Sequence, residues 1–343
     1  MFQNPEKLQI LIDKAQNLAS ARVVVACAAQ PVVLETLRDA TLLGLIAPRL
    51  VGDLGTILRL GRDLDWQIDP DWIVPAVTDT EAASLAVMMV RGGEADVLMK
   101  GNLHTDVLMR AVLNNDIGLR RAGRRCSHIF LLDVPGHDRL IGITDAAINI
   151  SPDLVAKGQI CQNGIDLFHT LGVPAPRVAV LSAVETVTDA IPSTVDAAAL
   201  TLMARRGQIT GAQVDGPLAF DNAVSIGAAH EKDILSEVAG AADILLVPDL
   251  VSGNILAKAL EYLGGAVAAG VALGLTAPVV LTSRADPAMA RMASLAVAAL
   301  MLDRTTTQST ETPMAETSLA AAPQLEHACC VPPVTAALAE AAK

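Results

Sequence analysis

Polar loops that follow apolar, strand-like runs carry the residues of this sequence whose types suit ligand binding. The first loop has the sequence MKGNLHTD and starts at Met99. Gly101 lets the backbone approach a ligand closely, and the helix that follows offers free N–H groups to an anion. Lys100 and Asn102 add a charge and an amide, and Arg110 lies about two helical turns further on. The same pattern also fits an ordinary strand-to-helix loop with a helix cap.

Two more loops lie at predicted strand-to-helix junctions. In VDGPLAFDNA, residues 214–223, a strand ends in Asp-Gly-Pro, which by itself is explained as a turn and a helix cap. In VPDLVSGN, residues 247–254, Asp249 lies just past a strand, and Gly253 and Asn254 follow at the junction with a helix. Open α/β sheets bind ligands outside the carboxyl ends of their strands, so both loops are candidate site segments.

The fourth loop, LTSRADP, follows a predicted core strand. Ser283 and Arg284 there present a hydroxyl and a guanidinium to a polar ligand, just before the N-terminus of a helix. Other common signatures are absent from the sequence: there is no G-x-G-x-x-G, no P-loop lysine motif and no G-x-S-x-G. No His, Cys or carboxylate set has a recognised metal spacing, so we expect no metal site.

Composition excludes some classes of function. The 343 residues include 25 Lys plus Arg against 37 Asp plus Glu, a net charge of −12. An acidic body repels phosphate backbones, and two Trp, one Tyr and four Phe provide few stacking platforms, so we expect no nucleic-acid partner. Five cysteines without a C-x-x-C pair indicate a reducing cytoplasm. The start, MFQNPEKLQILIDKAQ, predicts an amphipathic helix rather than a signal peptide.

An uncharged run of 22 residues separates Glu261 from Arg284 and is long enough to span a bilayer. Gly264, Gly265 and Pro278 interrupt this run, and its many alanines are only weakly hydrophobic. We therefore predict the end of a buried helix, a turn and a core strand, and no membrane association.

Short apolar runs alternate with helical stretches, which predicts an α/β fold with mainly parallel sheets and helices on both faces. The predicted strands are Arg22–Cys27, Leu45–Val51, Asp96–Met99, Ser127–Val134, Arg139–Ile143, Arg177–Leu181, Asp243–Val247 and Pro278–Leu281. The predicted helices are Pro31–Leu43, Glu81–Arg91, Leu103–Leu113, Leu154–Leu171, Thr194–Arg205 and Asn254–Ala269. Helix starts are indicated by a capping box at residues 78–81, and by Ser151-Pro152 and Asp286-Pro287, where a cap residue precedes proline.

The alternation breaks near residues 118–145. Two strand-like runs joined by PGHD predict a β-hairpin there, and such a break is where we expect one domain to follow another. Beyond Asp303 the composition shifts to Thr, Ser, Glu, Pro and Ala. This shift predicts a low-complexity tail with a short helix near residues 334–342.

Six strings in the order found here carry a resemblance to a known family. They are MKGNLHTDVLMRAVLN, VPGHDRLIGITDAAINISPDL, RVAVLSAVE, RGQITGAQVDGPLAFDNAVS, ADILLVPDLVSGNILAKAL and APVVLTSRAD. Together they resemble the phosphate acetyltransferase and phosphate butyryltransferase family, most closely its butyryltransferase-like branch. Six ordered strings are far more specific than any one of them.

The resemblance implies a reversible transfer in which acyl-CoA and inorganic phosphate give acyl phosphate and free coenzyme A. Coenzyme A would be a substrate, with no permanently bound cofactor. The implied fold has two α/β domains with the active cleft between them, similar to isocitrate and isopropylmalate dehydrogenases. Residues 1–118 plus 277–302 would form the first domain, 119–276 the second, and 303–343 the tail. Family members are commonly homodimers.

The resemblance also suggests roles for the polar loops. Ser283 and Arg284 match a Ser-Arg pair whose serine steadies the transition state and whose arginine binds phosphate. Arg110 falls in a segment that holds another phosphate-binding arginine. With it we group the loop residues Lys100, Gly101, Asn102 and His104 as the phosphate- and CoA-binding set.

On the second predicted domain, Asp249, Gly253 and Asn254 match the family run Pro-Asp-x-x-x-Gly-Asn, and we add them to the phosphate- and CoA-binding set. Asp145 matches an acidic position after the hairpin.

One departure concerns the general base. The acetyl branch places a catalytic aspartate seven residues after the serine, where this sequence has Ala290. Asp286 is a possible substitute, although an aspartate before proline at a helix start is a capping residue first. The thiol of coenzyme A has a pKa of about 8.5, so a base helps without being indispensable.

Direct transfer within a ternary complex is the mechanism that we expect. The alternative is a ping-pong route through Cys126 or Cys161, whereas Cys27 is expected in the core. Four arginines within six positions, Arg120, Arg121, Arg124 and Arg125, are candidates to hold the nucleotide end of coenzyme A. A solvated or subunit-facing loop explains them equally well.

Two other functions fit the pattern. A dehydrogenase of the same general fold would use a metal and NAD, and an NADH absorbance assay distinguishes it. A non-catalytic protein that binds coenzyme A or phosphate is the third interpretation, and alanine at position 290 is compatible with it.

Overall fold

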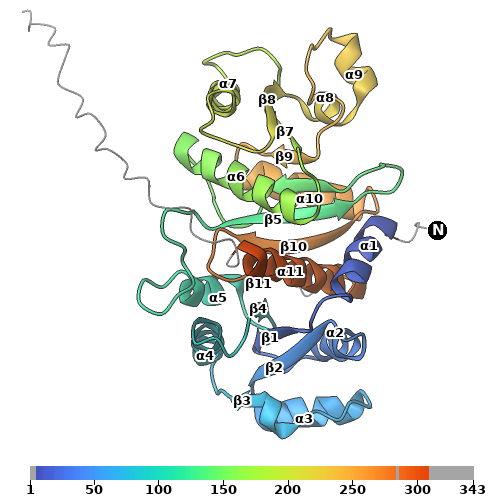
Figure 1. Ribbon diagram of the computed structural model, residues 1–343, viewed down its shortest axis with the longest axis vertical. Helices are drawn as coiled ribbons and strands as arrows, with labels where there is room; N and C mark the ends of the chain where they lie inside the picture. The colour runs from blue at the N-terminus through green and yellow to red at the C-terminus, as the bar shows by residue number, and fades with distance from the viewer. Residues whose placement is uncertain (1–4, 283–285, 309–343) are drawn as a thin grey trace, which may run out of the picture. The chain divides into compact units, whose positions relative to one another are not determined.

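The computed structural model describes residues 5–282 and 286–308, with side chains up to residue 302. Contacts divide the chain into one compact unit, Met1–Thr306, and a second unit, Thr307–Lys343. The strands of the first unit are β1 (Ala21–Ala26), β2 (Ile46–Gly52), β3 (Ile73–Pro75), β4 (Val97–Lys100), β5 (Ser127–Asp133), β6 (Ile141–Thr144), β7 (Arg177–Leu181), β8 (Gln213–Leu218), β9 (Ile244–Leu246), β10 (Val267–Leu273) and β11 (Val279–Val280) (Figure 1).

Helices follow most of these strands. They are α1 (Glu6–Ala15), α2 (Pro31–Leu42), α3 (Leu54–Asp63), the 3₁₀ turn η1 (Pro70–Trp72), α4 (Asp79–Arg91), α5 (Thr105–Val112), α6 (Leu154–Thr170), α7 (Pro192–Arg205), α8 (Phe220–Val224), α9 (Ile226–Glu231), α10 (Leu250–Tyr262) and α11 (Ala288–Gln308). The helix α11 continues beyond Asp303, where the sequence predicted the tail to start. The short helix expected near residues 334–342 lies outside the described residues.

The strands form one sheet of eleven, in the order β3-β2-β1-β4-β11-β10-β5-β6-β9-β7-β8. Neighbouring strands are parallel except at β11–β10, β10–β5 and β5–β6, which are antiparallel. The predicted α/β class is therefore confirmed, as is the hairpin of β5 and β6. The strands of residues 1–118 and 277–302 occupy one side of the sheet and those of 119–276 the other. The proposed boundaries between two domains remain a prediction.

Central strands such as β4, β6 and β9 are buried on both faces, which explains their apolar sequences. In β1, Val23 and Val25 join the core beneath α1, α2 and α11, whereas Val24 and Ala26 join the core beneath α4 and α5. Successive side chains of a strand point to opposite faces, so each face needs its own apolar set.

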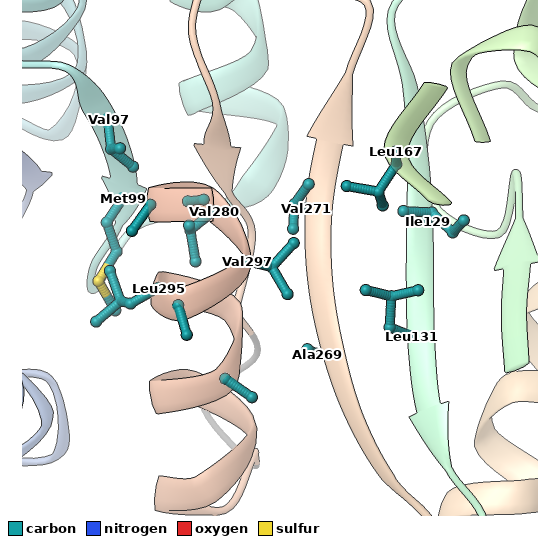
Figure 2. Close-up of a cluster of buried hydrophobic side chains, with 14 of the residues drawn as sticks. Val97, Met99, Ile129, Leu131, Leu167, Ala269, Val271, Val280, Leu295 and Val297 are labelled. Atoms are coloured by element: carbon teal, nitrogen blue, oxygen red, sulfur yellow. The ribbon is translucent and has the colours of Figure 1, made fainter. Parts of the chain in front are cut away.

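The helix α11 covers the middle of the sheet. Figure 2 shows Leu295 of α11 beside Met99 of β4, and Val297 between Val280 of β11 and Val271 of β10. All five side chains are at most 1% exposed. The helix thereby packs on β4 and β11, which are parallel, and on β10, which is antiparallel to β11. All three strands contribute to one core.

The main error of the sequence prediction lies at residues 254–273. The predicted helix Asn254–Ala269 ends at Tyr262, and a strand that the sequence did not reveal, β10, follows and pairs with β5 over seven residues. Gly265, at φ +68°, lies in the intervening turn. No helix in the described part of the chain is long and apolar enough to cross a membrane. The uncharged run is instead explained by β10 and β11, which are buried on both faces.

Local conformation confirms one predicted helix cap and corrects two other predictions, those for Ser151 and Cys27. Thr78 caps α4 by accepting a hydrogen bond from the backbone N–H of Glu81. Asp153, rather than Ser151, caps α6 and accepts from the N–H of Ala156. The chain leaves β1 before Cys27, whose φ of +58° ends the extended run. Cys27 is therefore half-buried beyond the strand and not a core residue of it.

Candidate active site

Lys100 and Thr282 meet where the parallel strands β4 and β11 end. The register pairs Met99 with Val280, so Lys100 and the segment after β11 leave the sheet side by side. The Nζ atom of Lys100 lies 3.3 Å from the carbonyl oxygen of Thr282 and 3.5 Å from that of Gly101. Lys100 and Thr282 are each 6% exposed. The buried Lys100 side chain thus contacts Thr282, the residue directly before Ser283 and Arg284. Ser283 and Arg284 themselves lie outside the described residues.

Gly101 serves close packing of the backbone. A Cβ atom at this position would overlap the carbonyl oxygens of Ala26 and Cys27 at the end of β1. The backbone N–H of Gly101 donates to the carbonyl of Ala26 at 2.9 Å. Gly101 therefore fixes the Lys100 loop against the neighbouring strand, whereas the sequence suggested close approach of a ligand.

We expect Gly101→Ala to lower the free energy of unfolding by about 2 kcal/mol, because the added methyl group forces backbone shifts in a packed interior. Urea denaturation measures this change. Gly55→Ala in α3 is the control, since a Cβ atom there would meet only the Asp53 carboxylate, at 3.8 Å. Equal denaturation midpoints for the two variants would contradict the packing argument.

The polar side chains in the rest of the first loop are exposed, whereas Leu103 is buried. Asn102 and His104 are exposed, and His104 precedes α5 as its N-cap without a side-chain capping bond. The side chain of Arg110 is 81% exposed and lies 3.1 Å from the Asp106 carboxylate. Arg110 lies in the last turn of α5, whereas Lys100 precedes the first turn.

Arg291 of α11 is a charged residue of this region that the sequence interpretation missed. It is 5% exposed, its Nε donates to Thr36 of α2 at 2.6 Å, and its Nη1 donates to the backbone carbonyl of Asp286. With Lys100 and Thr282, among others, it lines a cavity of about 10 Å³, roughly the room of one water molecule. A signal was present, because Arg291 is the one charged residue between Asp286 and Asp303.

Two carboxyl groups also approach this region. Burial raises the pKa of Glu261, at the end of α10, and the negative charge of Asp286 raises it further. Asp286 thus lies near enough to Glu261 for the two carboxylates to repel each other. Asp286 follows β11, whereas Glu261 lies in α10, which follows β9. Asp286 lies two residues before α11, which begins at Ala288, so it is displaced from the capping position that the sequence predicted.

The directions of the strands separate the remaining predicted residues from Lys100. Three successive antiparallel pairings, β11–β10, β10–β5 and β5–β6, make β6 and its parallel neighbour β9 run opposite to β4 and β11. The carboxyl ends of β6 and β9 therefore lie beside the amino ends of β4 and β11. Asp145, directly after β6, and Asp249, after β9, belong to this other end of the sheet.

Asp145 folds the loop that follows β6. Its carboxylate accepts hydrogen bonds from the backbone N–H groups of Ala147, Ile148 and Asn149, and from the Asn149 side chain. Burial raises the pKa of Asp145, while these hydrogen bonds act in the opposite direction. Asn149, held in this way, donates to the carbonyl of Cys126 at 2.9 Å and accepts from Arg125 at 3.1 Å.

The residues of the Asp-x-x-x-Gly-Asn run attach α10 to the same loop. Asp249 caps α10 through the N–H of Ser252, and Asn254 donates to the carbonyl of Ala146 at 3.2 Å. A Cβ atom on Gly253 would lie 2.6 Å from Val247 Cγ2 and 3.1 Å from the Cβ atom of Ala146, so a larger residue here would force these neighbours to shift. Asp249, Gly253 and Asn254 thus hold α10 against the loop after β6, and this structural role alone accounts for them.

The four clustered arginines, Arg120, Arg121, Arg124 and Arg125, line a pocket of about 540 Å³ together with Asn149. The pocket lies between the end of α5, the crossing into β5, the loop after β6 and the end of β10. Its volume falls in the range of small-molecule and cofactor sites, about 300–1,000 Å³. The Asp145 loop thus forms one wall of a basic pocket in an acidic protein.

Comparison with known proteins identifies the family of the chain. Residues 73–299 match the family model described as phosphate acetyl/butaryl transferase. The chain belongs to this family. A phosphate acetyltransferase of Rhizobium meliloti is 50% identical over 300 residues, 88% of this chain and 95% of that protein. A phosphate butyryltransferase of Clostridium acetobutylicum is 41% identical over 291 residues, 85% of this chain and 96% of that protein.

A solved structure agrees with this assignment to the phosphate acetyl/butyryltransferase family. The crystal structure of a branched-chain phosphotransacylase from Enterococcus faecalis matches with a TM-score of 0.71 and 29% identity. The match covers 82% of this chain and 99% of that one. The enzyme class predicted from the sequence, acyltransferase, is confirmed by these relatives, which include both acetyl and butyryl members.

The cysteines of this family member are weak candidates for a covalent intermediate. Burial raises the pKa of Cys126 and of Cys161 to about 12, and Cys161 is fully buried. The thiolate is the nucleophilic form of cysteine, so both residues are protonated and weakly reactive at neutral pH. Within residues 5–282 and 286–308, no group of three or more His, Cys, Asp or Glu side chains is arranged to hold a metal ion.

Proposed function

We propose that the protein transfers a short acyl group, acetyl or butyryl, reversibly between coenzyme A and inorganic phosphate. The observation that carries this proposal is the buried Lys100–Thr282 contact, which leads directly into Ser283 and Arg284 in a chain 50% identical to a phosphate acetyltransferase. We also infer a homodimer and a cytoplasmic location, as the family resemblance and the cysteine content led us to expect.

The proposed reaction is a direct transfer in a ternary complex. An oxygen of inorganic phosphate attacks the thioester carbonyl carbon, the carbon–sulfur bond breaks, and the thiolate leaves with the bonding electrons and takes up a proton. Ser283 donates a hydrogen bond to the developing oxyanion, a contribution of about 3 kcal/mol for a well-placed donor. Arg284 binds phosphate, because the planar guanidinium matches two of its oxygens at once.

Charges around this loop support the assignment of phosphate. Lys100 supplies a positive charge at the start of the Ser283–Arg284 segment, and Arg291 holds the segment's far end through the Asp286 carbonyl. Asp286 is the proposed proton acceptor in the reverse reaction, when the thiol of coenzyme A attacks acyl phosphate. The Asp286 carboxyl lies near enough to Glu261 for its negative charge to raise the pKa of Glu261, so the two carboxyl groups are neighbours.

The test is Ser283→Ala, which we expect to lower kcat at least about tenfold with folding intact, because it removes a transition-state hydrogen bond. Phosphate-dependent thiol release from acetyl-, propionyl- and butyryl-CoA measures both the rate and the acyl preference. Ser84→Ala is the control, since its hydroxyl donates within α4 to the carbonyl of Thr80. Normal turnover of Ser283→Ala would overturn the assigned role, and no thiol release from any of the three thioesters would overturn the proposed function.

A further inference from the structure

Arg291 carries a positive charge at a position that disfavours one. It is the fourth residue of α11 and is 5% exposed. A cation near the N-terminus of a helix is disfavoured, because the backbone dipoles leave a partial positive charge there. Burial lowers the pKa of the guanidinium, and the negative charges of Asp286 and Glu35 act in the opposite direction. A guanidinium here does not stabilise α11 as a helix, so its contacts indicate its role.

Two hydrogen bonds join α2 to the start of α11 through this guanidinium. Its Nε donates to Oγ1 of Thr36 at 2.6 Å, and its Nη1 donates to the backbone carbonyl of Asp286. Thr36 is 2% exposed and donates to a carbonyl one turn earlier in α2 at 3.0 Å, so the anchor is itself fixed. The backbone N–H of Arg291 donates to the carbonyl of Pro287 at 3.3 Å. Arg291 thus secures two successive carbonyls before the helix.

The cavity beside the guanidinium is too small for a substrate. Arg291 lines it with Lys100 and Thr282, and its volume of about 10 Å³ is roughly the room of one water molecule. A phosphate group is larger than a water molecule and does not fit. Arg291 therefore acts through the residues that it holds, and not by contact with the reacting atoms.

The carboxyl group of Asp286 lies near charges of both signs. Burial raises the pKa of Glu261, the charge of Asp286 raises it further, and Lys258 lowers it. The same Asp286 charge favours the ionised form of Arg291. Both effects require Asp286 to lie close to the two side chains, because they depend on charges at short range. Arg291 is therefore the positive neighbour that offsets the repulsion between Asp286 and Glu261.

We propose that Arg291 is a positioning residue for acyl transfer, which fixes Asp286 between α2 and α11 where its carboxylate can accept the proton of the attacking thiol. The inference rests on the proposed function, in which coenzyme A attacks acyl phosphate in the reverse reaction. In that step sulfur bonds to the acyl carbon, and the bond from this carbon to the phosphate oxygen breaks. Phosphate leaves with the bonding electrons, and the thiol proton passes to Asp286.

The test is Arg291→Gln, assayed as the reaction of coenzyme A with acetyl phosphate. We expect kcat to fall at least about tenfold, because displacement of a reacting group can cost about 100-fold, and KM for both substrates to stay within about twofold. Arg291→Lys keeps the charge and should recover part of the loss. Thr36→Val removes only the anchor and should lose less than Arg291→Gln. Arg38→Gln is the control and should keep kcat, since this arginine of α2 donates to a different backbone carbonyl, that of Leu64, at 3.0 Å.

A double-variant cycle with Asp286→Asn shows whether Arg291 acts through Asp286. We expect Arg291→Gln/Asp286→Asn to have a kcat within about twofold of that of Asp286→Asn alone, since residues that act as a unit are not additive. A merely structural role of Arg291 would give additive losses. Additive losses, or an unchanged kcat in Asp286→Asn, would overturn the inference even if acyl transfer is observed.

Hydrogen exchange of the full chain measures the same contact without the reaction. We expect the backbone amides of residues 288–291 to exchange at least about tenfold faster in Arg291→Gln than in the wild type and Arg38→Gln, because the start of α11 loses a charged hydrogen bond. Exchange in the distant strand β7 should not change. Equal exchange at residues 288–291 would overturn the inference. Faster exchange there in a protein without acyl transfer would support the contact and overturn the proposed function instead.

Discussion

Lys100→Met is expected to lower kcat/KM for phosphate-dependent thiol release about 100-fold, the effect of removing one positioned charged donor from an active site. The variant keeps an unbranched side chain, one atom shorter, and removes the Nζ atom that contacts the carbonyl oxygens of Thr282 and Gly101. The variant leaves these two buried carbonyl oxygens without this donor, so we expect a modest fall in Tm that does not by itself account for the loss of activity. Steady-state kinetics and thermal unfolding of the same preparations measure both effects.

Lys157→Met is a matched control for this prediction. Lys157 is also 6% exposed, but it lies in α6 and pairs with Asp196 at 2.6 Å. Its removal leaves a carboxylate without its partner, so we expect a lower Tm and an unchanged kcat. A loss of activity by Lys100→Met that parallels a loss of Tm would show that Lys100 acts only on folding, and that result would remove it from the proposed site.

Most of the strands were predictable because a strand that is buried on both faces has a continuous run of apolar residues. A strand such as β1 fills one core with Val23 and Val25 and the other with Val24 and Ala26, so it has no polar face. The strand β10 was missed because its sequence, VAAGVAL, is rich in alanine and continues an apolar helix. Its partner β5 decides its conformation, and that pairing joins residues more than 130 positions apart.

The candidate site was only partly predictable, because its layout depends on the directions of the strands. The sequence predicts that the four loops follow strands, but it does not give the direction in which each strand runs. Residues such as Asp249 and Gly253 in fact support the loop after β6, at the opposite end from Lys100, since β6 and β9 run against β4. No local pattern encodes three antiparallel pairings in succession, so this layout could not be derived without the fold.

His128 should make the protein less stable in mild acid. It lies in β5, is 1% exposed, and packs edge-on against Phe130, with ring centres 4.5 Å apart. Its Nδ1 atom has no hydrogen-bond partner among the described residues. Burial lowers the pKa of His128 from 6.5 to about 3. Between these two pH values the unfolded chain binds a proton that the folded protein does not.

The sign of the effect follows from this difference. A group with a lowered pKa in the folded state contributes stability that is present above the unfolded pKa and is lost as the pH falls below it. Each pH unit corresponds to about 1.4 kcal/mol, so the free energy of unfolding should fall by about 2 kcal/mol between pH 6.5 and 5 through His128 alone. Urea denaturation across this range, compared with a variant that cannot titrate, measures the contribution.

His128→Gln and His128→Phe are two such variants, and both should show a flatter dependence of stability on pH whatever their stability at pH 7. His230→Gln, at an exposed position of α9, is the control and should follow the wild-type profile. Other groups titrate equally in all these proteins, so the difference between the wild type and each variant isolates the imidazole. Parallel profiles for the wild type and both His128 variants would mean that protons reach this imidazole without unfolding, and the buried strand β5 would then have to open locally in mild acid.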